Sequence, residues 1–282
     1  MITTTDFFTP IIDDPYVQGM IAACNATNDV YAKGGVDIIS VLVLMGMPEN
    51  LPLSVQKDVL KGFCDFCRKL DAPVLGGHTI VCPWPIMGGA VTAIADREKT
   101  ILVSKAEVGD RLILTKPLGV QPVMKVLRLP SREQDEIARL IPEDEISQAI
   151  SQAIDIMTRT DRDAALAMLE VGVNAATDIT GFGLFGHASN MAEESNVSIE
   201  ITALPVIRWA PKLAEILGYP LVKGHSAETA GGLLVSLPEE KADELLKSLK
   251  KRGCEGHEIG IVKKGPAKVQ FHKKNRVIEV PP

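Results

Sequence analysis

Carboxylate and amide side chains gather in two short segments near the start of the 282-residue chain. Asp6 lies in the stretch T-T-T-D-F-F at 3–8, and a carboxylate near the end of a buried strand is costly unless it is paired or metal-bound. Asn25 and Asp29 are four residues apart, so on a helix they share one face. Oxygen groups in this arrangement suit a hard cation. The alternatives are a turn residue at Asp6 and a solvent-facing polar stripe at Asn25 and Asp29.

Two glycine-containing segments could bind an anion. In G-G-H-T at 76–79, the glycines would let backbone N–H groups turn toward an anion, and the alternative is a plain tight turn. The segment A-T-D-I-T-G-F-G-L-F-G-H at 176–187 contains G-x-G-x-x-G before an expected helix. Residues 173–179 are too polar for the central strand of a dinucleotide-binding unit. A phosphate or metal site at the helix N-terminus, with Asp178 as its carboxylate, fits this segment better.

The hydrophobic pattern predicts the elements that would position these residues. Strands are expected at 2–8, 38–44, 74–75, 87–95, 111–115, 232–237, 269–271 and 277–280. Helices are expected at 16–33, 54–70, 146–158, 161–171, 183–194, 209–217 and 239–252. A polar connection at 96–109 separates two groups of elements. We therefore expect an α+β or α/β protein with domains at 1–98 and 104–282.

Composition excludes several classes of protein. Hydrophobic residues make up 46% of the chain and charged residues 23%, which is ordinary for a globular protein. The longest apolar run, 38–47, is about half of what a bilayer-spanning helix needs, so we expect no membrane span. A net charge of −6 and few aromatic residues argue against nucleic-acid binding. Five cysteines, an odd number, without a visible signal peptide, indicate reduced thiols and a cytoplasmic location.

Taken together, six segments resemble the selenophosphate synthetase family, also called selenide, water dikinase. They are T-T-D-F-F-T-P-I-I-D-D-P-Y at 4–16, N-A-T-N-D-V-Y-A-K-G-G at 25–35, A-P-V-L-G-G-H-T-I at 72–80, L-T-K-P-L-G-V-Q at 114–121, A-T-D-I-T-G-F-G-L-F-G-H at 176–187 and T-A-G-G-L-L at 229–234. Their combination is highly specific, and the resemblance covers nearly the whole chain. The related synthetases that make aminoimidazole ribotide, and the thiamine monophosphate and hydrogenase-maturation kinases, share the fold but less of these motifs.

The resemblance implies an aminoimidazole ribotide synthetase-like fold. The N-terminal sheet would pair with that of a second subunit to close a barrel, so a homodimer is expected. The implied reaction converts ATP, selenide and water to selenophosphate, AMP and phosphate, with Mg²⁺ required and K⁺ assisting. The residues that match the family's nucleotide-contacting segments are Thr4, Thr5, Asp6, Asp29, Gly76, Gly77, His78 and Thr79. Asp6, Asp29 and Asp178 match its metal and phosphate carboxylates.

Two departures accompany the resemblance. The family's catalytic Cys or selenocysteine and its essential Lys precede T-T-D-F-F and would lie upstream of Met1, so no catalytic residue is assigned in this chain. A core-quality strand begins at residue 2, so we expect a shortened form of a longer protein, and a short natural terminus is the alternative. The resemblance then implies that these 282 residues are inactive, or nearly so, by themselves.

The second departure is S-A-E-T-A-G-G at 226–232, where the family reads close to D-P-Q-T-S-G-G. Glu228 replaces a neutral amide and Ala230 a hydroxyl, and the extra carboxylate would repel a phosphate that approached this turn.

Two other functions stay open. One is a different ATP-dependent synthetase or small-molecule kinase of the same superfamily. The other is a non-catalytic homologue, against which the three retained carboxylates argue.

Overall fold

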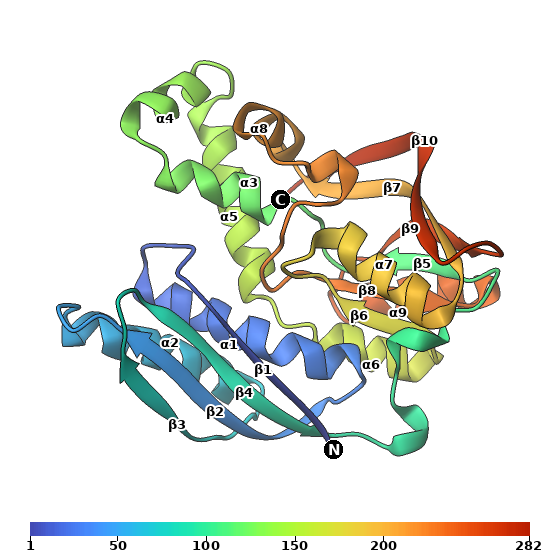
Figure 1. Cartoon of the computed structure of the whole chain (residues 1–282), viewed down its shortest axis with the longest axis horizontal. Helices are drawn as coiled ribbons and strands as arrows, with labels where there is room; N and C mark the ends of the chain where they lie inside the picture. Colours follow the sequence, from blue (N-terminus) through green and yellow to red (C-terminus); the bar gives the residue numbers. More distant parts are fainter.

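A computed structural model of the chain describes residues 1–282, apart from the side chain of Lys274. The N-terminal half contains a four-stranded sheet in the order β1-β4-β2-β3 (Figure 1). Its strands are β1 Ile2–Phe8, β2 Asp37–Met47, β3 Val74–Val81 and β4 Ile86–Ile94, and its helices are α1 Pro15–Ala32 and α2 Leu53–Lys69. β4 runs antiparallel to β1 and β2, whereas β2 and β3 are parallel.

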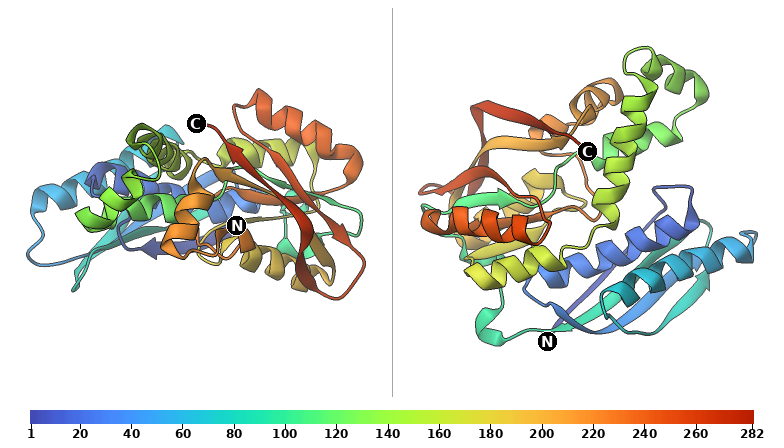
Figure 2. Two further views of the ribbon diagram at one scale, coloured as in Figure 1. Left: turned by 90° about the horizontal axis from the view of Figure 1, so that it is seen from above. Right: turned by 180° about the vertical axis from the view of Figure 1, so that it is seen from behind.

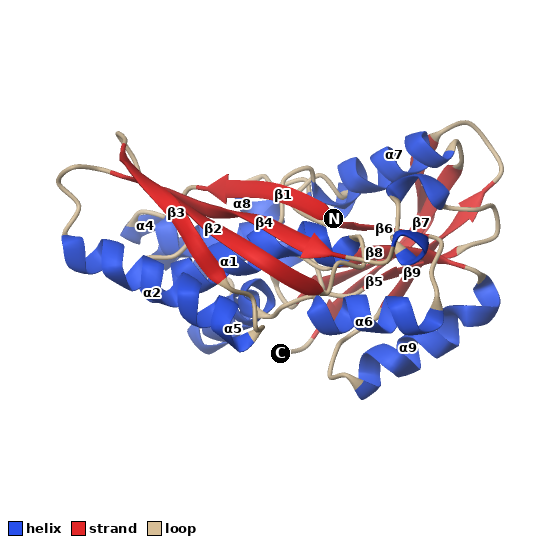
Figure 3. Cartoon of the chain, turned by 90° about the horizontal axis from the view of Figure 1, so that it is seen from below, coloured by secondary structure: helices blue, strands red, loops and turns tan.

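The two helices cover one face of this sheet and leave the other open (Figure 3). Side chains of β1 alternate between the faces, because successive residues of a strand point in opposite directions. Large apolar side chains on the uncovered parts of the sheet are more than one-third exposed, namely Phe7, Ile39, Leu42, Leu75, Ile80, Val81 and Ile94. An apolar sheet face of this kind is typical of an interaction surface.

Helix α1 begins and packs in ways that its sequence explains. The Asp14 side chain accepts hydrogen bonds from the backbone N–H groups of Tyr16 and Val17, and Pro15 occupies the first turn. Gly19 of α1 and Gly62 of α2 let the two helix backbones touch. A Cβ added at Gly62 would lie 1.9 Å from the carbonyl oxygen of Tyr16.

The C-terminal half contains a six-stranded sheet in the order β10-β7-β9-β5-β8-β6. Its strands are β5 Arg111–Leu114, β6 Ala175–Asp178, β7 Ser198–Ile207, β8 Leu233–Leu237, β9 His257–Lys263 and β10 Lys268–Val280. Its helices are α3 Val120–Lys125, α4 Ser131–Ala138, α5 Glu143–Thr158, α6 Arg162–Val171, α7 Gly183–Ser195, α8 Ala210–Leu217 and α9 Ala242–Lys251. Helix α7 lies on one side of the sheet, and α6 and α9 lie on the other (Figure 3).

Helix α1 lies between the two halves of the molecule. In the views of Figures 1 and 2 it has α2 on one side and the C-terminal half on the other. It contacts α5, α6 and β6 as well as its own sheet. Of its 18 residues, 13 are buried. This position explains why the apolar and small side chains of α1 are not confined to a single stripe.

Most predicted elements are present, with four corrections. Residues 76–79 form no turn, because they continue β3 to Val81. The predicted strands 269–271 and 277–280 are parts of one strand, β10. Strands β7 and β9 and helices α3 and α4 were not predicted. Strand β6 was not predicted either, but it lies at the sheet edge, antiparallel to β8, which confirms that this polar segment is not the central strand of a dinucleotide-binding unit.

The two sheets are separate in sequence. β4 ends at Ile94 and β5 begins at Arg111, and two short 3-10 helices, Arg97–Lys99 and Val103–Lys105, lie between them. The domain limits 1–98 and 104–282 stay a prediction. Among the described residues no helix combines the length and the apolar character that crossing a bilayer demands. All five cysteines are free thiols.

Candidate functional site

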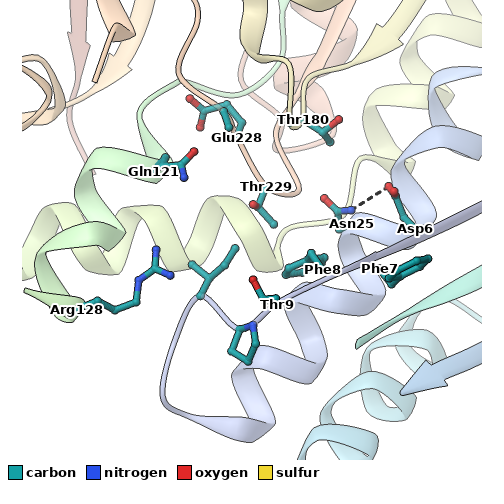
Figure 4. Close-up of a pocket in the computed structure, with 14 residues that line it drawn as sticks. Asp6, Phe7, Phe8, Thr9, Asn25, Gln121, Arg128, Thr180, Glu228 and Thr229 are labelled. Atoms are coloured by element: carbon teal, nitrogen blue, oxygen red, sulfur yellow. Dashed lines mark hydrogen bonds between the residues drawn. The ribbon is translucent and has the colours of Figure 1, made fainter. Parts of the chain in front are cut away.

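A cavity of about 320 Å³ lies where the end of β1 meets the C-terminal half (Figure 4). It is lined by Asp6, Phe7, Phe8, Thr9, Pro10, Ile11, Asn25, Gln121, Arg128, Thr180, Gly181, Ala227, Glu228 and Thr229. The lining therefore comes from β1, α1, the α3 region and the segments that follow β6 and precede β8. Five of the six segments singled out in the sequence contribute to this lining, and only the segment 72–80 does not.

Asp6 is the acidic side chain at one end of this cavity. It lies on the helix-covered side of β1, and Asn25 Nδ2 donates a hydrogen bond to its Oδ2 at 3.0 Å (Figure 4). Burial and the nearby Asp29 carboxylate raise the pKa of Asp6 to about 6, although the hydrogen bond from Asn25 acts in the opposite direction. Two carboxylates thus repel each other in a half-buried place, which a bound cation would relieve.

Asp29 and Asp178 extend this cluster behind the cavity. Thr4 Oγ1 donates to Asp29 Oδ2 at 2.5 Å. Burial raises the pKa of Asp178 well above its ordinary value, and its contact with Asp29 adds to the increase. Lys33 lies nearby and donates to the Ala176 carbonyl at 3.2 Å; burial lowers its pKa, and Asp178 and Asp29 oppose that change. The three predicted carboxylates are therefore electrostatically coupled to one another.

The donor set fits magnesium held jointly with a phosphate ligand. Within the part of the chain that the structure describes, no three acidic, imidazole or thiol groups converge closely enough to hold a metal ion alone. Mg²⁺ in proteins usually keeps waters and takes one or two carboxylates plus substrate phosphates, so a looser set is what it needs. Asn28, the residue before Asp29, has a buried Oδ1 without a donor among the described residues.

The other predicted nucleotide residues lie elsewhere. The Thr5 side chain is on the exposed face of β1, opposite to Thr4 and Asp6. Residues 76–79 lie on the exposed strand β3 and do not line the interdomain cavity. At Gly77 the backbone of β2 approaches so closely that a Cβ would lie 2.1 Å from the Val43 carbonyl oxygen. Close strand packing, and not an anion-binding turn, therefore accounts for this glycine.

The first residue of the chain takes no part in the cavity. Met1 directly precedes β1, its side chain is exposed, and it is not among the residues that line the cavity. The placement of the family's catalytic Cys or selenocysteine and Lys upstream of Met1 stays a prediction. The same holds for the expected inactivity of these residues by themselves.

The sequence did not indicate Arg128, and it indicated Gln121 only as the last residue of L-T-K-P-L-G-V-Q; both residues line the cavity across from Asp6 (Figure 4). Gln121 lies in α3, Arg128 ends the 3-10 helix Val126–Arg128 that follows it, and no spacing pattern marks either residue. Arg128 brings a positive charge to the side of the cavity that faces the carboxylates. A guanidinium there suits a phosphate oxygen.

Glu228 lines the cavity, but its carboxylate is held by backbone N–H groups. Its Oε1 accepts from Gly119 N at 2.8 Å and its Oε2 from Val120 N at 2.9 Å. The side chain is buried and ties the 226–232 turn to the start of α3. Both oxygens of Glu228 are therefore engaged by backbone N–H groups, and the expected repulsion of a phosphate at this turn stays a prediction.

The Glu228→Gln variant is expected to remove a pH dependence of stability. Burial raises the pKa of Glu228 to about 8 from its ordinary 4.5, although the two backbone N–H groups oppose this. The folded state then holds this proton more tightly than the unfolded state, so stability falls as pH rises from about 4.5 to 8. Urea unfolding of both proteins between about pH 5 and 9 checks this. A decline that persists unchanged in the Gln variant would assign it to another group.

Comparison with known proteins identifies the family. Residues 1–95 match the AIR synthase related protein N-terminal domain, and residues 107–272 match the corresponding C-terminal domain. The selenide, water dikinase of Methanocaldococcus jannaschii is 49% identical, over 98% of this chain and 81% of its own length. The chain belongs to the selenide, water dikinase family. A second family member, from Methanococcus maripaludis, is 43% identical over 99% of this chain and 85% of its own length.

Solved structures confirm the fold of this dikinase family member. A crystal structure of the hydrogenase maturation protein HypE in complex with ATP has a TM-score of 0.77, covering 95% of this chain and 80% of that one. The identity is only 18%, so this likeness concerns the fold alone. The predicted AIR synthase-like two-domain α/β architecture is confirmed.

Proposed function

We propose that this chain is the ATP-using core of a selenide, water dikinase, which forms selenophosphate, AMP and phosphate from ATP, selenide and water. The observation that supports this most is the gathering of Asp6, Asp29 and Asp178, from three separate elements, beside an interdomain cavity. Phosphoryl transfer depends mainly on positioning and on charge stabilisation through a metal ion, and coupled carboxylates supply the protein's share of that.

The cavity residues take distinct parts in this proposal. Asp6, Asp29 and Asp178 would hold Mg²⁺, which when bound would offset the charge of the triphosphate. Thr4 keeps Asp29 in place through its hydroxyl, and Asn25 does so for Asp6. Arg128 would bind a triphosphate oxygen from across the cavity. K⁺ is kept as an assisting cation without assigned residues, and the family's nucleophile is not among the residues that carry the resemblance.

Isothermal titration calorimetry with ATP tests the nucleotide part. Binding that requires Mg²⁺ supports the proposal, and no binding with or without Mg²⁺ contradicts it. Phosphorus NMR of reactions with selenide tests the substrate. Because these 282 residues are expected to be inactive, or nearly so, by themselves, AMP together with a selenide-dependent phosphorus signal from this chain alone would support dikinase chemistry and contradict that expected inactivity. ADP with a phosphorylated carbon compound would assign the chain to another kinase of the superfamily.

We also propose that two copies of the chain pair through the open face of the N-terminal sheet. That face carries Phe7, Leu42 and Ile80, and an apolar recess between them is lined by Phe7, Leu44, Met45, Gly46, His78, Ile80 and Ile86. Burying it against an identical face would remove these side chains from water. Thr5 and residues 76–79 are exposed on this sheet and do not line the interdomain cavity. Their predicted contacts with ATP would therefore have to be made where the sheets of two subunits pair.

The Leu42→Glu variant is expected to be monomeric where the parent chain is a dimer. Leu42 is 42% exposed on β2, and a buried charge without a partner would cost several kcal/mol at the pairing face. Leu60→Glu on α2 is the matched control, because Leu60 is 41% exposed but belongs to the helical layer. Sedimentation velocity measures the masses. A monomeric parent, or loss of the dimer in both variants, would count against pairing through the sheet.

A further inference from the structure

A buried ion pair stands behind the cavity, in the C-terminal half. Lys116 follows β5 and Asp161 precedes α6; their side chains are 3% and 2% exposed, and Nζ lies 2.8 Å from Asp161 Oδ2. Nζ also donates to the carbonyl oxygens of Arg159 at 2.6 Å and Ala230 at 3.1 Å. These three acceptors use all three N–H groups of the ammonium, so its position is fixed. A buried pair of this kind is seldom more stabilising than an apolar pair, which suggests another role for it.

The Ala230 carbonyl belongs to a turn that is unusually constrained. Ala230 has a φ of 47°, in the left-handed region that costs a residue with a Cβ about 1 kcal/mol or more. The two glycines that follow Ala230 lie where a side chain would not fit. A Cβ at Gly231 would lie 2.3 Å from the Ile179 carbonyl oxygen, and one at Gly232 would lie 2.4 Å from Lys116 N. The turn is therefore held against the end of β6, which carries Asp178, and against the end of β5.

The same turn fixes a side chain of α1. The Ala230 N–H donates to Asn25 Oδ1 at 2.8 Å. Because this oxygen is an acceptor for a backbone N–H, the amide nitrogen of Asn25 must point the other way, and it donates to Asp6 Oδ2 (Figure 4). A flipped amide would face a donor with its NH₂ and a carboxylate with its oxygen. Asn28 adds a second tie, from its Nδ2 to the Gly231 carbonyl at 3.0 Å.

We propose that Lys116 and Asp161 are positioning residues for the carboxylate cluster: through the Ala230 turn and the Asn25 amide they hold Asp6 in the orientation that binds the metal–nucleotide complex. This inference rests on the proposed function. Neither Lys116 nor Asp161 lines the cavity, so both act through other residues. This series of hydrogen bonds, the relay, runs from Lys116 and Asp161 in the C-terminal half through the Ala230 turn and Asn25 to Asp6 in the N-terminal sheet. The relay therefore also sets the position of Asp6 relative to Asp178.

The test removes both charges at once, in Lys116→Met with Asp161→Asn, because removing one partner of a buried pair leaves an uncompensated charge. The Mg²⁺ concentration that gives half-maximal ATP binding is expected to rise about tenfold, the lower end of the range for lost outer-shell partners of a metal site. With both proteins metal-free, the backbone amides of residues 226–233 are expected to exchange hydrogen faster in the double variant than in the parent. Lys116→Gln with Asp161→Asn keeps a donor at this place and is expected to fall between the parent and the first variant.

Ser236→Ala is the matched control. Ser236 is fully buried and donates to Asp110 Oδ2 at 2.7 Å, so its loss destabilises the same sheet without touching the relay. Its Mg²⁺ midpoint is expected to stay at the parent value. If the parent chain does not bind ATP, the proposed function fails. If the parent binds and a folded double variant keeps the parent's Mg²⁺ midpoint, or if the control shifts as much as the variant, the positioning role is wrong.

Discussion

The Asp29→Asn variant is expected to lose Mg²⁺-dependent ATP binding by about 100-fold or more. Asp29 raises the pKa of both Asp6 and Asp178 and accepts a hydrogen bond from the Thr4 hydroxyl, so it interacts with every other member of the cluster. Loss of one partner from a buried charge pair costs about 2–5 kcal/mol, and each 1.4 kcal/mol is about tenfold in affinity. Calorimetric titration of both proteins with ATP and Mg²⁺ measures the difference.

The same change is expected to stabilise the protein in the absence of ligands. Three acidic groups that repel one another are a cost to the folded state, and a neutral amide at position 29 removes one of them. The thermal midpoint without Mg²⁺ should therefore rise while affinity falls. Asp13→Asn is the control, because Asp13 is an exposed acid of the same half and should change neither quantity. A lower midpoint together with weaker binding would indicate general damage to the fold.

The Gly62→Ala variant is expected to lose about 3 kcal/mol of unfolding free energy. The new methyl group would lie 1.9 Å from the Tyr16 carbonyl oxygen, so α1 and α2 would have to move apart along their shared interface. Overpacking of a core typically costs about 1–3 kcal/mol, and a contact with backbone leaves little room to adapt. In a helix without such a contact, replacing Gly by Ala stabilises the protein by about 1 kcal/mol. A loss of stability would therefore support the close contact between α1 and α2, and a gain would contradict it.

Gly181→Ala provides the comparison for that experiment. An added Cβ at Gly181 meets nothing within 4 Å, and its stability should change by no more than about 0.5 kcal/mol. Urea unfolding followed by circular dichroism gives both values. Equal losses in the two variants would mean that the helix crossing is looser than its geometry indicates.

Local patterns were sufficient for the elements whose neighbours are simple. The 3.6-residue spacing of α2 and the apolar run of β2 predicted both elements to within a few residues. Strand β7 was missed, and it contains Pro205, a residue that normally argues against an interior strand. The exception has a physical cause, because the pairing of β7 with β9 ends at Ile201. Beyond it, that side of β7 meets Leu118 in an isolated bridge, which uses the Pro205 carbonyl and the Ile207 N–H and needs no N–H from Pro205.

The glycines of β3 misled for a related reason. Two consecutive glycines usually indicate a turn, but the close approach of β2 at Val43 provides another use for them that only tertiary packing reveals. Local sequence patterns were limited in the same way for the candidate site. Side-chain type and spacing indicated Asp6, Asp29 and Asp178 one at a time, and the family resemblance brought them together. Arg128 and the Lys116–Asp161 pair follow from the path of the chain, which no local pattern contains.

The place of α1 has a consequence for how the protein unfolds. With 13 of 18 residues buried, and with Asn25 and Asn28 bonded to a turn more than 200 residues away, this helix cannot lose its contacts to one half alone. The molecule should therefore behave as one cooperative unit, with a single calorimetric transition in place of two separate domain melts. The amides of α1 would then exchange only through global opening, at the slow rate that marks the most stable core of a protein.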